Sequence, residues 1–158
     1  MDNQVTRRGF LGRTVSLGVV GLTAAGLCVC LLSGCLKKDK TPNISAKWLE
    51  IKNDRIVVNV EKVKALKKVG GSAKIAHPKL KERIILIHPS DARYLALEGL
   101  CTHRGRPVMY HHASRELRCI NYGHSRFQMD GTVIKGPATR ALKVYRTLYL
   151  GGKLEVFL

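Results

Sequence analysis

The chain has 158 residues, with 28 lysines and arginines against 11 aspartates and glutamates, and a formal net charge of +17. About 120 residues follow Leu36, which is enough for one domain with a modest core, and we find no repeat and no second domain in them. Such a charge suggests nucleic acid as a partner, but the basic residues are scattered with little aromatic interleaving, so we expect no nucleic-acid binding.

The first 36 residues predict membrane targeting. Thr6-Arg7-Arg8-Gly9-Phe10-Leu11 matches the twin-arginine export motif, and an uncharged stretch from Thr14 to Leu36 follows it. As a helix this stretch would extend over roughly 34 Å, enough to cross a hydrocarbon core of about 30 Å. We therefore expect residues 1–36 to be a twin-arginine signal or membrane anchor helix. It would hold the folded domain on the extracytoplasmic, periplasmic side of a membrane.

Two fates of this segment remain open. Leu32-Ser33-Gly34-Cys35 has the form of a bacterial lipobox, which would make Cys35 the acylated first residue of a mature lipoprotein. Alternatively, the segment stays uncleaved, and Cys28, Cys30 and Cys35 are small apolar residues of a transmembrane helix. Either fate tethers the domain to a membrane.

Residues 37–47 are interpreted as a linker, and residues 48–158 as one mostly β domain. Short segments rich in Val, Ile, Leu or Tyr and bounded by turn residues predict strands at 55–60, 83–88, 93–97, 108–110, 116–120, 131–134 and 142–157. Gly151-Gly152 divides the last segment as a two-residue hairpin turn. The sequence of Lys62 to Lys68 is compatible with either a helical turn or a strand edge. No long amphipathic helix is visible, so we expect an all-β, antiparallel domain.

Two short Cys/His pairs carry the strongest chemical signal. Cys101-Thr102-His103 is the first, and Cys119 with His124 is the second; they contain the only cysteines after Leu36. Two thiolates and two imidazoles can hold either a zinc ion or a two-iron cluster, with one iron on two cysteines and the other on two histidines. The pairs alone leave this choice open.

The sequence around both pairs resembles the Rieske iron-sulfur family, over CTHRGRPV at residues 101–108 and CINYGHSRFQMDGTVIKGPATRALKVY at residues 119–145. In the first half, Cys101, His103 and Gly105 match the family's Cys-x-His-x-Gly. In the second half, with small shifts of register, the matching residues are Cys119, Ser125, Phe127, Asp130, Gly131 and Gly136-Pro137-Ala138. A weaker likeness reaches back to about Trp48. The resemblance implies a Rieske-like antiparallel β-sandwich with the cluster-binding loops at one tip.

One departure from the family lies in the second pair. The family has its second histidine three positions after the cysteine, which is Tyr122 here, whereas His124 stands two residues further on. We favour His124 over Tyr122 as the ligand, because a phenolate oxygen is a hard donor and a delocalised cluster prefers nitrogen or sulfur. His111 and His112 are reserve candidates that we expect to be solvated.

The resemblance implies a [2Fe-2S] cluster whose metal ligands are Cys101, His103, Cys119 and His124. It also implies that Ser125 gives a hydroxyl hydrogen bond to a bridging sulfide, and that the protein transfers electrons.

The family's quinol-oxidising branch usually clamps its two loops with a disulfide. Arg106 and, most nearly, Asn121 occupy the positions of its two cysteines here. Phe127 stands where high-potential members have a tyrosine, so we expect a low to intermediate reduction potential.

Three functions fit these observations. The first is the iron-sulfur subunit of a quinol-oxidising membrane complex, with quinol and membrane cytochrome subunits as partners. The second is a Rieske subunit of an exported oxidoreductase or a free-standing carrier, for which the basic domain suggests an acidic redox partner. The third is a zinc-stabilised binding domain. No nucleophile and base pair is apparent, so we predict an electron-transfer subunit rather than a hydrolytic or covalent enzyme.

Overall fold

The computed structural model describes residues 39–120 and 124–158. The predicted signal or anchor at residues 1–36, including the lipobox cysteine Cys35, lies outside these ranges, and so does Tyr122. Within them, no helix is both long and apolar enough to cross a membrane.

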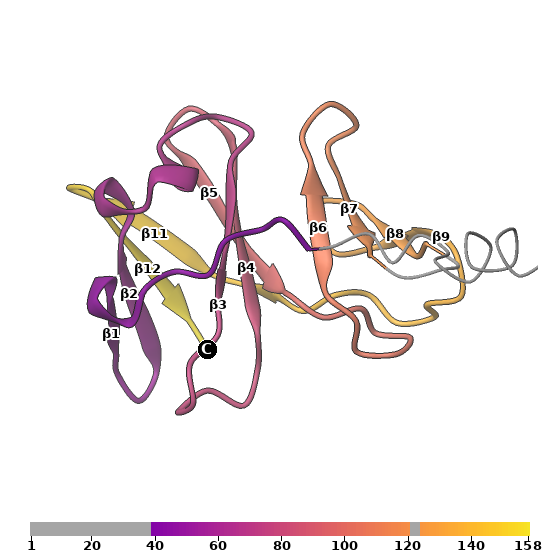
Figure 1. Ribbon diagram of the computed structural model, residues 1–158, viewed down its shortest axis with the longest axis horizontal. Helices are drawn as coiled ribbons and strands as arrows, with labels where there is room; N and C mark the ends of the chain where they lie inside the picture. The colour runs from indigo at the N-terminus through magenta and orange to yellow at the C-terminus, as the bar shows by residue number, and fades with distance from the viewer. Residues whose placement is uncertain (1–38, 121–123) are drawn as a thin grey trace, which may run out of the picture. The chain divides into compact units, whose positions relative to one another are not determined.

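The described chain is all-β and antiparallel, as the sequence predicts (Figure 1). Its strands are β1 (Leu49–Ile51), β2 (Arg55–Asn59), β3 (Ser72–Ile75), β4 (Ile84–Ser90), β5 (Arg93–Glu98), β6 (Val108–His111), β7 (Glu116–Cys119), β8 (Arg126–Phe127), β9 (Val133–Lys135), β10 (Val144–Tyr145), β11 (Thr147–Leu150) and β12 (Lys153–Phe157). The helical elements of this part of the chain are three short 3₁₀ turns, η1 (Ala46–Trp48), η2 (Val60–Lys62) and η3 (Lys64–Leu66).

Every predicted strand segment contains a strand, and the segment at 142–157 contains three. Gly151 and Gly152 form the predicted turn between β11 and β12, both with positive φ. Lys62 to Lys68 forms helical turns rather than a strand edge. The sequence did not indicate β1, β3 or β8, because each has only two to four residues and too short an alternation to recognise.

The strands form three sheets, ordered β1-β2-β12-β11, β10-β5-β4-β3 and β6-β7-β8-β9. The second sheet is buried on both faces. Ile84 and Leu86 of β4 belong to one hydrophobic cluster with β2 and β12, while Ile85 and Ile87 belong to another with β6 and β7. Successive side chains of a strand point to opposite faces, so the continuous apolar run of β4 supplies both cores.

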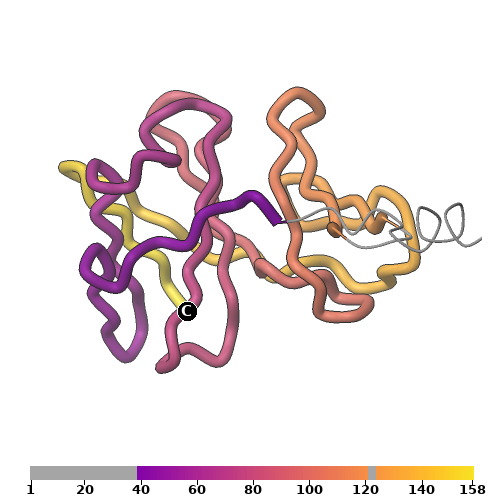
Figure 2. The backbone as a smooth tube through the Cα atoms, in the orientation of Figure 1, coloured from indigo at the N-terminus to yellow at the C-terminus, as the bar shows by residue number. Residues whose placement is uncertain are grey.

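The β6-β7-β8-β9 sheet is an insertion between β5 and β10. Figure 2 shows the chain leaving β5 for this sheet and returning from it to β10. The two connections meet, because the Glu98 N–H donates to the Lys143 carbonyl at 2.8 Å and Leu97 pairs with Val144. The inserted sheet carries both Cys/His pairs, so its packing on Ile85 and Ile87 sets where they lie.

The core described above predicts the effect of Leu86→Ala. Leu86 is fully buried, so truncating it should lower the free energy of unfolding by about 2–5 kcal/mol. Ile134→Ala is the matched control, since Ile134 is 43% exposed and its truncation should change stability by less than about 0.5 kcal/mol. Urea denaturation followed by circular dichroism measures both. Equal losses in the two variants would contradict this assignment of the core.

Candidate functional site

The two cysteines of the predicted site lie in one buried cluster. Cys101 lies shortly after β5 and is 2% exposed. Cys119 is the last residue of β7 and is 7% exposed. Both pack with Val108, Leu117 and Phe127 in the core beneath the inserted sheet. Neither cysteine is in a disulfide. Two thiols are therefore held in a place from which water is largely excluded.

The first loop is folded tightly around Cys101. The Cys101 N–H donates to the Arg106 carbonyl at 2.7 Å, and the Gly105 N–H donates to the Cys101 carbonyl at 2.8 Å. Gly105 has a φ of +62°, in the left-handed region, and a Cβ there would meet nothing within 4 Å. Glycine is favoured at this position by its backbone conformation and not by lack of space. His103 lies in the turn and is exposed.

The second loop is anchored at both of its described ends. The Cys119 N–H donates to the Ser125 carbonyl at 2.9 Å, and the Ile120 N–H donates to the Pro107 carbonyl of the first loop at 3.1 Å. His124 is exposed, with its Nδ1 3.4 Å from the Cys119 carbonyl oxygen. Its φ of +37° is uncommon for a residue with a Cβ. His124 therefore has a left-handed backbone conformation two residues before β8 begins.

A third segment, which includes the Gly136-Pro137-Ala138 run, connects the two loops. The Ala138 N–H donates to the Ser125 Oγ at 3.1 Å. The Thr102 Oγ donates to the Arg140 carbonyl at 2.6 Å. Because the Ser125 oxygen is the acceptor of the Ala138 N–H, its own proton remains available for another acceptor. This segment lies against the first loop and the second loop at once.

The structure brings together part of the predicted ligand set. Cys101 and Cys119 lie in one core, and the Nδ1 of His124 lies near the carbonyl oxygen of Cys119. Among residues 39–120 and 124–158, however, no three or more His, Cys, Asp or Glu side chains are grouped so that they could hold a metal ion. The reserve candidate His112 lies with its Nδ1 3.2 Å from the Tyr110 hydroxyl.

The donor chemistry of these residues fits a [2Fe-2S] cluster. Two sulfur donors are fixed in an apolar core, and two imidazoles stand on exposed loops next to them. Sulfur and imidazole are the ligands that such a cluster takes, and its electron partners must approach from outside. The Ser125 hydroxyl can donate to a sulfur acceptor.

Cys119 and His124 line one hollow of about 380 Å³. Three basic residues, Arg118, Arg126 and Lys135, stand on its wall, together with His111. This side of the second loop is therefore a positively charged approach to the candidate ligands.

Glu116 joins the strands on either side of the second loop, a role that sequence reasoning missed. Its carboxylate accepts hydrogen bonds from Arg126 of β8 at 2.8 and 2.6 Å, and from the Arg118 Nε at 3.1 Å. The register that pairs Arg118 with Arg126 brings all three side chains together. Only knowledge of that register could have revealed the network, because Glu116 and Arg126 are ten residues apart in the sequence.

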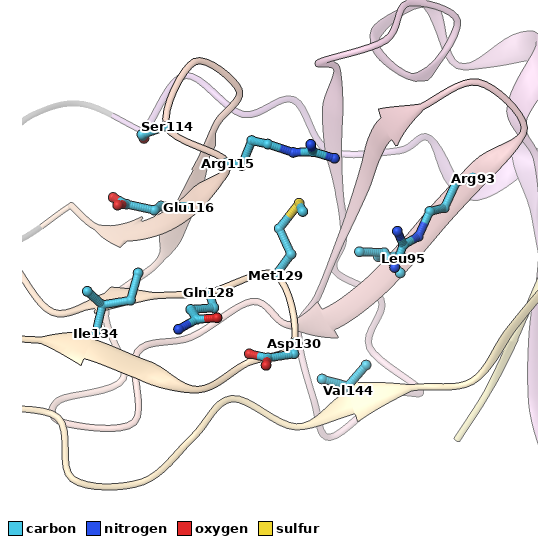
Figure 3. A pocket seen from close by; sticks show the side chains of 10 residues that line it. All are labelled: Arg93, Leu95, Ser114, Arg115, Glu116, Gln128, Met129, Asp130, Ile134 and Val144. Atoms are coloured by element: carbon cyan, nitrogen blue, oxygen red, sulfur yellow. The ribbon is translucent and has the colours of Figure 1, made fainter.

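A second hollow, of about 640 Å³, contains none of the predicted ligands. Figure 3 shows Arg93 and Leu95 of β5 on one side of it, and Arg115 on the other. Met129 points into the space between the two arginines. We assign no part of the candidate site to it.

The Glu116 network predicts a pH dependence of stability. Hydrogen bonds from Arg126, and to a smaller degree from Arg118, hold the pKa of the Glu116 carboxyl below its usual value against the opposing effect of burial. Because the pKa of this carboxyl is lower in the folded state, its ionised form stabilises the fold. This stabilisation is fully present above the unfolded pKa of about 4.3, and it is lost as the pH falls through the folded pKa.

Glu116→Gln should therefore lower the thermal midpoint at neutral pH, and its difference from the wild type should shrink on acidification. Arg126→Lys keeps the positive charge and loses the bidentate contact with Glu116. Its thermal midpoint should lie between those of Glu116→Gln and the wild type. Thermal unfolding at a series of pH values measures this. A difference that stays constant as the pH falls would contradict the role of Glu116.

Residues 53–146 match the model of the Rieske [2Fe-2S] domain family. No curated protein matches the chain.

The solved structures that are similar to the chain include the following two. The cyanobacterial plasma membrane Rieske protein PetC3 from Synechocystis PCC 6803 is 29% identical, over 54% of this chain and 84% of that one, with a TM-score of 0.47. The ferredoxin of carbazole 1,9a-dioxygenase from Nocardioides aromaticivorans IC177 is 18% identical, over 58% and 90%, with a TM-score of 0.49. The family match covers more than half of the sequence and contains both Cys/His pairs. The chain therefore belongs to the Rieske [2Fe-2S] domain family, and its cofactor is a [2Fe-2S] cluster.

Proposed function

We propose that this protein is a membrane-tethered electron carrier whose cluster ligands are Cys101, His103, Cys119 and His124. The observation that carries the proposal is the burial of two cysteines in one core, each in a loop that also bears an exposed histidine. When bound, the cluster supplies one-electron transfer. Family membership favours this cofactor over the zinc alternative.

The buried cysteines and the exposed histidines would have different roles. Cys101 and Cys119 would hold one iron in the apolar core. His103 and His124 would hold the other iron and, being exposed, would face the redox partner. The imidazole nitrogens that do not bind iron can take up or release a proton, which suits partners that exchange protons together with electrons.

Ligand chemistry favours a quinol-oxidising membrane complex as the setting, with this chain as its iron-sulfur subunit. Quinol oxidation releases protons as well as electrons, and exposed imidazoles can accept the protons. The predicted export signal and tether at residues 1–36 support an extracytoplasmic, periplasmic location, with residues 37–47 as the linker and 48–158 as the Rieske domain. The partners would then be quinol and membrane cytochrome subunits.

One observation favours a second setting, a Rieske subunit of an exported oxidoreductase or a free-standing carrier. Arg106 stands where the quinol-oxidising branch has a loop cysteine, so the loops lack its disulfide. They are joined by the hydrogen bond between Ile120 and Pro107 instead. The basic wall of the hollow at Cys119 and His124 suits an acidic protein partner. A b-type cytochrome that co-purifies with the chain would exclude this second setting.

Substitution of the ligands tests the proposal. Cys101→Ser and Cys119→Ser should lose the cluster, with iron content falling towards zero. His124→Ala should lose or alter the mixed-ligand electron paramagnetic resonance signal, whereas Tyr122→Phe should keep it. Metal analysis, absorption and resonance spectra of the purified protein measure these outcomes. A colourless preparation with stoichiometric zinc would refute the proposal, and an unchanged signal in His124→Ala would refute the assignment of His124.

Ser125→Ala should lower the reduction potential. The Ser125 oxygen accepts the Ala138 N–H, which leaves its hydroxyl proton for a sulfur of the cluster. Such a hydrogen bond stabilises the reduced, more negative state, so its loss disfavours reduction. Ser45→Ala is the control, because Ser45 is exposed before η1 and its side chain makes no capping hydrogen bond. A redox titration measures both potentials, and equal potentials in Ser125→Ala and the wild type would contradict the role of Ser125.

A further inference from the structure

The end of the domain away from the cluster loops carries exposed leucines. Leu148 is 53% exposed and Leu150 is 77% exposed, both on β11 at the tip of the hairpin with β12. Tyr149 between them lies on the other face of the strand and is 37% exposed, with its ring 4.8 Å from that of Tyr94. Because side chains alternate along a strand, the two leucines point away from the core.

Lysines surround this hairpin. The segment that follows β2 and the hairpin itself hold five exposed lysines, which are Lys62, Lys64, Lys67, Lys68 and Lys153. Glu61 is the one acidic residue in residues 60–71 and 147–153. None of the five lysines forms an ion pair in the described part of the chain, although lysines elsewhere do.

The lysine segment and the hairpin form one surface. The Val60 N–H donates to the Gly152 carbonyl at 3.1 Å, and Gly152 packs against the Glu61 side chain. The ring of Tyr94 lies tilted at 52° against that of Tyr149, and the Tyr94 hydroxyl donates to the Leu66 carbonyl at 3.4 Å. Figures 1 and 2 show the hairpin tip beside η2. We call Leu148, Leu150 and the five lysines the leucine–lysine patch.

We propose that the leucine–lysine patch docks the domain on the surface of an anionic lipid bilayer. Exposed aliphatic side chains ringed by lysines are the composition of an interfacial membrane contact, in which the apolar groups enter the headgroup boundary and the lysines contact anionic lipids. Each lysine close to an anionic leaflet strengthens association by about fivefold. The proposal uses the membrane location proposed above and does not depend on quinol chemistry.

Docking through this patch fixes how the domain presents its cluster. The β6-β7-β8-β9 sheet, which carries the ligand loops, lies at the other end of the described domain from the hairpin tip (Figure 1). A docked domain would therefore direct the cluster loops towards the aqueous phase. In this position it can meet a water-soluble partner, whereas a quinol site within the bilayer requires release of the patch.

Hydrogen exchange on the full-length, cluster-loaded protein tests the proposal. The protein is reconstituted in vesicles of phosphatidylcholine alone or of phosphatidylcholine with an equal amount of phosphatidylglycerol. Flotation first establishes that the chain is in the membrane. In the mixed vesicles, the peptides that cover residues 60–71 and 147–153 should gain protection relative to phosphatidylcholine alone, and about 1 M salt should remove the gain.

Two variants probe the two parts of the patch, each with a matched control. Lys64→Glu with Lys67→Glu should reduce the gain in protection by about tenfold or more, and Leu150→Ser should reduce it as well. Lys79→Glu with Lys81→Glu makes the same charge change at exposed positions outside the patch, and Ile134→Ser removes an exposed apolar side chain from the inserted sheet. Both controls should leave the gain unchanged.

The outcomes separate this proposal from the proposed function. Flotation without lipid-dependent protection would refute the docking and leave the tether intact. Failure to float would refute the tether. Protection that is the same in both lipids and that falls on dilution of the protein among vesicles would show that a second copy of the chain covers the patch, which would also refute docking on lipid.

Discussion

The burial of Cys101 and Cys119 in one apolar cluster is the constraint on which the rest of the site depends. Both thiols pack against Phe127 and against the isoleucines of β4 that face the inserted sheet. The loops can then be short and exposed, because their ends are already fixed by the strands on which they stand. A backbone hydrogen bond between the two loops, and the hydroxyls of Thr102 and Ser125 that bond the 136–140 segment, complete the arrangement without a disulfide.

Much of the fold could be predicted from the sequence, because alternation and turn residues are local. The hairpin at Gly151-Gly152 and the apolar run of β4 are examples. The double use of β4, with Leu86 in one core and Ile87 in the other, could not be predicted, since it depends on which sheets face it. The candidate ligands were visible as a spaced motif. The Glu116 network and the contact between Ser125 and Ala138 were not, because strand register and loop packing create them.

The two ends of the domain have different surface chemistry. The hollow at His124 combines candidate ligands with arginines that are already partly engaged by Glu116. The leucine–lysine patch combines lysines outside any ion pair of the described chain with exposed aliphatic side chains. Uniform positive charge would not distinguish a protein partner from a lipid surface. Exposed leucines beside the charge add a second criterion, because the headgroup boundary of a lipid surface can receive apolar side chains.

The insertion of the β6-β7-β8-β9 sheet between hydrogen-bonded neighbours has a consequence for how this protein can change. Glu98 and Lys143 are hydrogen-bonded neighbours at the two ends of the insertion. The ends of the inserted segment therefore stay adjacent whatever the length of that segment. Loops whose ends are already adjacent tolerate replacement well. The ligand spacing, charge and potential of the inserted sheet can therefore diverge, provided that the sheet keeps the apolar face that packs on Ile85 and Ile87.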